Sequence, residues 1–86
     1  KALVVDDTIV YRKIVGDALN QMPGIAVVGT ANNGRIALSK IKTLKPDLMT
    51  LDIEMPEMNG IELLQELQSM DTPPLVIIVS TLTHQG

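Results

Sequence analysis

Residues 2–7 read Ala-Leu-Val-Val-Asp-Asp, a short apolar run that ends directly in two aspartates. Consecutive apolar residues predict a strand that is buried on both faces, because a strand with one solvent-exposed face would alternate apolar and polar residues. Strands of this kind are typical of parallel sheets that are covered by helices on both sides. This stretch therefore favours an α/β fold.

Three further apolar runs predict strands at residues 25–28, 47–52 and 75–79. The segments between them predict helices at residues 8–22, 35–44 and about 61–70, because their apolar residues recur at helical spacing. Pro-Gly at 23–24, Lys-Pro at 45–46 and Pro-Pro at 73–74 end these helices. Apolar strands that alternate with helices predict parallel pairing through right-handed crossovers, which is an α/β doubly wound parallel sheet.

The helical spacing also predicts which side chains face the sheet. The first helix, capped by Thr8 or Asp7, is expected to pack through Val10, Ile14, Ala18 and Met22, joined by Tyr11, Val15 and Leu19. The second is expected to pack through Ile36, Ala37, Ile41 and Leu44.

Length and composition limit the possible functions. The 86 residues fit one domain with one core, and that core must be aliphatic because Tyr11 is the only aromatic residue. Ten acidic and seven basic residues give a net charge of −3, which argues against direct binding to nucleic acid or to an anionic membrane. The chain has no cysteine, no apolar segment near the roughly 20 residues that span a bilayer, and no signal-peptide pattern. We expect a cytoplasmic protein.

Acidic and hydroxyl side chains follow three of the predicted strands, at the edge where ligands of open parallel sheets bind. Asp6 and Asp7 follow the first strand, and Ser80 follows the fourth. Asp52 ends the third strand, with Glu54 two residues later. Carboxylates that lie close together raise one another's pKa unless a cation compensates their charge. Oxygen ligands without His or Cys select a hard cation, so the sequence predicts a Mg²⁺ site.

A carboxylate beside such a metal ion can attack phosphorus and form an acyl phosphate. Asp52 is the candidate nucleophile, because it stands last on the predicted central strand.

The order and spacing of several motifs resemble the receiver domains of two-component response regulators. These motifs are Leu-Val-Val-Asp-Asp at 3–7, Arg12, Ala-Asn-Asn-Gly at 31–34, Lys-Pro-Asp at 45–47, Asp-Ile-Glu-Met-Pro-Glu-Met-Asn-Gly at 52–60 and the apolar run ending at Ser80. The resemblance covers the whole chain and implies a flavodoxin-like receiver fold. Within this family, Thr-Leu-Asp-Ile-Glu-Met-Pro at 50–56 and Val-Ser-Thr-Leu-Thr at 79–83 are most similar to the receiver of chemotaxis protein-glutamate methylesterase.

The resemblance implies a role for each residue of the predicted site. Asp52 would accept a phosphoryl group from a histidine kinase, and it would share Mg²⁺ with Asp7 as a direct ligand and with Asp6 mainly through water. Glu54 would contribute its backbone carbonyl to the same metal site. Ser80 would be the switch hydroxyl that hydrogen-bonds the phosphoryl group.

The resemblance also implies that residues 1–86 are a receiver domain that is incomplete at its C-terminus, with four of five strands. The chain starts directly before a strand and ends at Gly86, soon after another, which agrees with a fragment. The phosphate-binding Lys of the family and its aromatic switch partner would follow Gly86. An effector domain would lie elsewhere in the parent chain, and in the methylesterase subfamily that domain is a hydrolase.

Simpler interpretations remain for the individual residues. Asp6 and Asp7 could cap the first helix, Ser80 could bond to nearby backbone, and the side chain of Glu54 could be solvated. A hydrolytic triad of Ser80, His84 and Asp52 is disfavoured because the chain has no G-x-S-x-G pattern.

Two other functions are considered as alternatives to a phosphorylation switch. The first is an aspartate-nucleophile phosphatase of the haloacid dehalogenase type, although its nucleophile would belong to an Asp-x-Asp pattern on the first strand. The second is a pseudo-receiver that acts only as an interaction module without phosphorylation.

Overall fold

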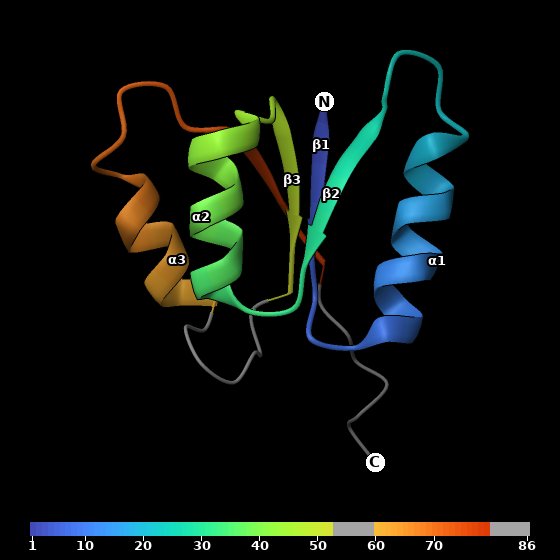
Figure 1. Ribbon diagram of the computed structural model, residues 1–86, viewed down its shortest axis with the longest axis horizontal. Helices are drawn as coiled ribbons and strands as arrows, with labels where there is room; N and C mark the ends of the chain where they lie inside the picture. The colour runs from blue at the N-terminus through green and yellow to red at the C-terminus, as the bar shows by residue number, and fades with distance from the viewer. Residues whose placement is uncertain (53–59, 80–86) are drawn as a thin grey trace.

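The computed structural model describes residues 1–52 and 60–79, which form one four-stranded sheet with helices on both faces (Figure 1). In chain order the elements are β1 (Ala2–Val5), α1 (Ile9–Asn20), β2 (Val27–Ala31), α2 (Gly34–Leu44), β3 (Leu48–Leu51), α3 (Gly60–Leu67) and β4 (Leu75–Ile78). The predicted order of strands and helices is confirmed, and so is the doubly wound parallel sheet.

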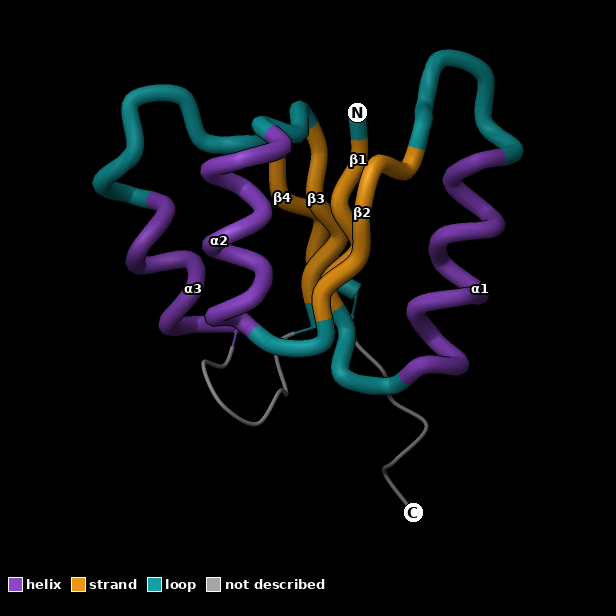
Figure 2. Tube along the Cα trace, in the orientation of Figure 1, coloured by secondary structure: helices purple, strands orange, loops and turns teal. Residues whose placement is uncertain are grey.

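The strands lie in the order β2-β1-β3-β4, and each neighbouring pair is parallel. The chain therefore goes outward from β1 to β2 and then crosses back to place β3 on the other side of β1. This reversal is the switch point at which doubly wound folds bind their ligands. Helices α2 and α3 cover one face of the sheet and α1 covers the other (Figure 2).

The core consists of aliphatic and methionine side chains on both faces of the sheet, as the composition predicts. On the side of α2 and α3 the buried residues are Leu3, Val5, Ala31, Ala37, Ile41, Met49, Leu51, Leu63 and Leu67. On the side of α1 they are Ala2, Val4 and Leu19. All of β1 is buried, which confirms that this strand has two covered faces.

Strand β2 differs from its predicted bounds of 25–28 at both ends, because it begins at Val27 and continues through Gly29 to Ala31. A glycine after an apolar run usually ends a strand, since it has no side chain to pack. Here Gly29 pairs with Leu3 inside the sheet. A Cβ atom at position 29 would lie 2.9 Å from Cδ1 of Leu44 in α2. The glycine leaves room for the side chain of Leu44 against the strand, a contact that the sequence does not reveal.

For helix α1 the prediction is right for Leu19, which is buried, and for Val15, which packs against the same core, but it is wrong for Val10, Ile14 and Met22. Gly16 and Leu19 are its buried residues, whereas Val10, Ile14 and Met22 are 58%, 56% and 49% exposed. Apolar residues occupy more than one side of this helix, so periodicity identifies an amphipathic helix without showing which side faces the sheet. In α2 the prediction is right for Ala37 and Ile41, which are both buried, and wrong for Ile36, which is 39% exposed.

Within residues 1–52 and 60–79, no helix is long and apolar enough to cross a bilayer.

Candidate functional site

Three carboxylates meet at the carboxyl ends of β1 and β3. Asp6, Asp7 and Asp52 each offer an oxygen atom that lies within 4.8 Å of the other two. Asp6 and Asp52 are only 3% and 5% exposed, and Asp7 is exposed. This edge is the lower end of the sheet in Figure 1. The convergence predicted from the strand ends is confirmed for these three residues.

The parallel ladder sets the positions of the two buried carboxylates. Val5 pairs with Leu51, so the residues that follow them, Asp6 and Asp52, stand at the same level of the sheet. The backbone N–H of Asp52 donates to the carbonyl of Val5 at 3.0 Å, and the N–H of Asp6 donates to the carbonyl of Ala31 at 3.0 Å. Both aspartates are therefore fixed by the sheet, whereas Asp7 lies one residue beyond the ladder.

Asp6 also connects the site to helix α1. Its Oδ1 atom accepts a hydrogen bond from the N–H of Thr8 at 2.9 Å. Thr8 occupies the N-cap position without a side-chain cap bond, and its hydroxyl donates to Oδ1 of Asp7 at 3.3 Å. Asp6 therefore fits both interpretations, as a residue that supports the start of helix α1 and as a member of the acidic cluster, because the same carboxylate does both.

Burial raises the pKa of Asp6 above its usual value. The hydrogen bond from Thr8 lowers this pKa, the negative charge of Asp7 raises it, and the positive charge of Arg12 lowers it by a smaller effect. The net direction is upward, so the folded protein stabilises the ionised form of Asp6 less well than water does. A bound cation would lower the pKa of Asp6 again, because a nearby positive charge favours the ionised carboxylate.

The donor set fits Mg²⁺. Among the residues that the structure describes, this is the one group of three or more metal-ligating side chains, and it contains carboxylates alone. Oxygen ligands select hard cations, and Mg²⁺ in particular binds through a few carboxylates while keeping water or phosphate in its remaining positions. The exposure of Asp7 leaves an open side on which such groups could bind.

Glu54 and Ser80 lie outside the described residues, so their predicted roles stay predictions. Arg12 is a residue to which the sequence assigned no role. Its Nη1 atom donates to the backbone carbonyl of Asp6 at 2.8 Å and so fixes the turn between β1 and α1. No periodic pattern in the sequence predicts a hydrogen bond between a side chain and a backbone carbonyl six residues away. The presence of Arg12 among the family motifs was the one sign that this residue has a role.

Comparison with known proteins identifies the family. Residues 2–85 match the family model of the response regulator receiver domain. The chain is 60% identical over its whole length to a protein-glutamate methylesterase/protein-glutamine glutaminase of Desulfotalea psychrophila, and 51% identical to one of Geobacillus kaustophilus. It spans 24% of each of these proteins, about a quarter of their length.

Solved structures agree with this result. The response regulator domain of Thermotoga maritima CheB superposes with a TM-score of 0.87 at 45% identity, over 99% of this chain and 63% of that one. A CheX-CheY-BeF3-Mg²⁺ complex from Borrelia burgdorferi gives a TM-score of 0.84 at 32% identity, over 98% of this chain and 64% of that one. The predicted resemblance to the methylesterase receiver is confirmed, and the chain belongs to the response regulator receiver domain family, where it is similar to receivers of the CheB type.

Proposed function

We propose that this chain is a phosphorylation switch in which Asp52 accepts a phosphoryl group from a histidine kinase. The observation that supports this most directly is the position of Asp52. Its carboxylate is buried at the end of a central strand, and one of its oxygen atoms lies within 4.8 Å of oxygen atoms of Asp6 and Asp7. The family assignment points to the same reaction, and it does not agree with the haloacid dehalogenase alternative.

In the proposed transfer, a carboxylate oxygen of Asp52 attacks the phosphorus atom of a phosphohistidine. The new O–P bond forms as the P–N bond breaks, and the imidazole leaves with the electron pair. The backbone bond of Asp52 to Val5 holds the nucleophile at the sheet edge, which reduces the freedom that is lost on reaction. Mg²⁺, when bound, neutralises negative charge on the phosphoryl oxygens.

Asp6, Asp7 and Asp52, together with the backbone carbonyl of Glu54, would hold the metal ion. Of the three aspartates, Asp7 is the exposed one, so it can reach an incoming cation first. The CheY complex with BeF3 and Mg²⁺ supports this assignment, because its receiver is 32% identical to this chain. Ser80 would hydrogen-bond the new phosphoryl group and change the surface beside β4.

The same proposal extends to the parent protein. The chain would be the regulatory domain, incomplete at its C-terminus, of a cytoplasmic chemotaxis protein-glutamate methylesterase. The hydrolase would lie in a separate effector domain. The names of the relatives at 60% and 51% identity support this extension.

The test uses protein that contains the complete receiver domain, incubated with Mg²⁺ and acetyl phosphate and then weighed by intact mass spectrometry. We expect a gain of one phosphoryl group in the wild type and no gain in Asp52→Asn. Asp17→Asn, which removes an exposed carboxylate of α1, is the matched control and should be modified like the wild type. An unmodified wild type would refute the proposal, and absence of Mg²⁺ binding would favour the pseudo-receiver instead. Rapid turnover of small phosphomonoesters would favour the phosphatase.

A further inference from the structure

Arg12 connects helix α1 to the acidic cluster through one hydrogen bond. Its Nη1 atom donates to the backbone carbonyl of Asp6 at 2.8 Å. This carbonyl belongs to the peptide group between Asp6 and Asp7, which are two of the three carboxylates of the cluster. Arg12 therefore binds the chain at the peptide group that connects two candidate metal ligands.

The carbonyl of Asp6 lies where the sheet ends. The N–H of Asp6 donates to the carbonyl of Ala31 at 3.0 Å. If this parallel ladder continued, the carbonyl of Asp6 would accept from the same neighbouring strand. Strand β2 ends at Ala31, however, and the chain turns into α2 with Asn33 as its N-cap. Because Asp6 is only 3% exposed, its carbonyl has little access to water and needs a donor, which Arg12 supplies.

The position of Asp7 depends on this carbonyl. The peptide group is planar, so rotation about ψ of Asp6 moves its carbonyl oxygen and Asp7 together, while Asp6 itself stays in the sheet. Asp7 has little else to hold it, since it lies beyond the ladder and its contact with the Thr8 hydroxyl, at 3.3 Å, is longer than an ordinary O–H···O bond. A hydrogen bond that fixes the carbonyl of Asp6 therefore also fixes Asp7.

The stability of α1 does not explain why a cation lies here. Arg12 is in the first turn of the helix, where its backbone N–H donates to the carbonyl of Thr8 at 3.0 Å. A positive charge near the N-terminus of a helix is disfavoured by the helix dipole, and the first turn of α1 contains no acidic residue to offset it. The contact with Asp6 accounts for the position of Arg12 better than the helix does.

The charge and the hydrogen bond of Arg12 should act on a bound cation in opposite directions. The guanidinium is close enough to Asp6 to lower the pKa of its carboxyl group, so it would also repel a cation held by that group. Loss of the charge alone should therefore strengthen cation binding. Loss of the hydrogen bond should weaken it, because Asp7 would no longer be held beside the other two carboxylates.

We infer that Arg12 is a positioning residue of the cation site: its hydrogen bond to the carbonyl of Asp6 holds Asp7 where its carboxylate can share a divalent cation with Asp52. This inference rests on the proposed function, in which the three aspartates hold Mg²⁺. Arg12 itself contacts neither the metal ion nor the phosphoryl group. Its hydrogen bond outweighs its charge, so the site binds Mg²⁺ more tightly with this cation than without it.

The test measures the dissociation constant for Mg²⁺ by isothermal titration calorimetry, on protein that contains the complete receiver domain and without a phosphodonor. Arg12→Met keeps an unbranched apolar side chain but removes the charge and the donors. We expect it to raise the dissociation constant by about tenfold, the lower end of the loss that is typical when a residue that orients a metal ligand is removed. Arg12→Lys returns the charge and an N–H donor, so it should recover part of the affinity.

A second measurement separates positioning from a general loss of stability. Without metal, ¹⁵N relaxation should show a lower order parameter for the Asp7 amide in Arg12→Met than in the wild type. The Asp6 amide, which is bonded to Ala31, should be unchanged. A variant that is merely less stable but still folded would not loosen Asp7 alone.

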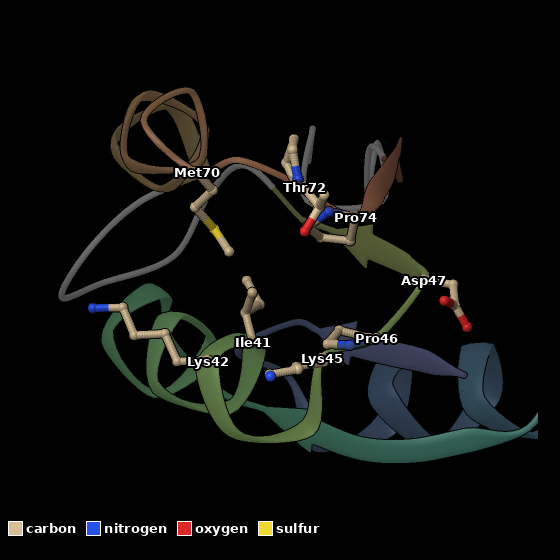
Figure 3. A pocket seen from close by; sticks show the side chains of 9 residues that line it. Ile41, Lys42, Lys45, Pro46, Asp47, Met70, Thr72 and Pro74 are labelled. Carbon is tan, nitrogen blue, oxygen red and sulfur yellow. The ribbon is translucent and has the colours of Figure 1, made fainter.

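Two lysines provide controls for the loss of a positive charge. Lys40 and Arg12 line the same cavity of about 210 Å³, and Nζ of Lys40 donates to the carbonyl of Thr30 in β2, which is a bond of the same kind outside the cluster. Lys42 lines a groove of about 530 Å³ at the opposite end of the sheet (Figure 3). Neither Lys40→Met nor Lys42→Met should raise the dissociation constant for Mg²⁺.

The inference is overturned if Arg12→Met binds Mg²⁺ as tightly as the wild type or more tightly, because the charge would then be the dominant effect. It is also overturned if Lys40→Met weakens binding equally, or if the order parameter of the Asp7 amide does not change. These outcomes leave the proposed function intact. A wild type that does not bind Mg²⁺ would overturn both.

Discussion

Replacing Asp7 by Asn tests whether the acidic cluster is built for a cation. The carboxylate of Asp7 has an oxygen within 4.8 Å of oxygens of Asp6 and Asp52. At 4.8 Å two unit charges repel by about 0.9 kcal/mol at the dielectric constant of water and about 3.5 kcal/mol at an effective value of about 20. Because Asp7 is exposed, the lower figure applies more closely, and loss of two repulsive pairs should raise the free energy of unfolding by about 2 kcal/mol without metal.

With Mg²⁺ bound, the wild type should be more stable than Asp7→Asn. A cation at one hundred times its dissociation constant stabilises the wild type by about 2.7 kcal/mol. Asp7→Asn has lost a charged ligand, so it should gain much less. The assay is urea unfolding followed by circular dichroism, once with EDTA and once with Mg²⁺. Asp17→Asn, which breaks the exposed 3.4 Å pair with Lys13, should change stability by less than about 1 kcal/mol in both buffers. The reasoning fails if Asp7→Asn is no more stable than the wild type in EDTA and gains as much from Mg²⁺.

Three further predictions concern the sheet, the second helix and the pH dependence. Met49→Ala should lower the free energy of unfolding by about 2–5 kcal/mol, because the side chain is fully buried, whereas Ile9→Ala, 71% exposed, should change it by less than about 0.5 kcal/mol in the same urea assay. Asn33→Ala should cost about 0.5–2 kcal/mol, because the Asn33 side chain accepts the 2.9 Å cap bond from the N–H of Ile36, and Asn33→Ser should restore most of that loss. The raised pKa of Asp6 means that the folded state holds this proton more tightly, so without metal its contribution to stability is greatest below the usual pKa of 3.8 and is lost as the pH rises through the folded pKa. Asp6→Asn should therefore flatten that part of the stability curve, and an unchanged curve would contradict the assignment.

Much of the architecture could be predicted from the sequence because its strands are short, continuous apolar runs. Such runs, when they are short and flanked by turn residues, are typical of strands with both faces covered, as is the case for Ala2–Val5. The meeting of Asp6 with Asp52 followed from the same reasoning, since residues after neighbouring parallel strands reach the same edge.

Other features depend on contacts that no local pattern reports. Strand β2 continues through Gly29 because this residue pairs with Leu3, and the contact that favours a glycine there comes from Leu44, fifteen positions away, whose Cδ1 would lie 2.9 Å from a Cβ atom at position 29. The exposed side of α1 could not be distinguished from the buried one, because Ile14 and Leu19 are equally apolar. The roles of Glu54 and Ser80 rest on the family resemblance.

The hydrogen bonds that extend the ladder beyond β1 and β3 have a consequence for amide hydrogen exchange. The N–H groups of Asp6 and Asp52 are each bonded to a neighbouring strand at 3.0 Å, so they can exchange with solvent only when the sheet itself opens. Protection at these two amides should therefore approach that of the central strands. The backbone positions of these two aspartates would stay in register through local fluctuations that leave the sheet intact, whereas Asp7, which lies beyond the ladder, could move to adjust to a ligand.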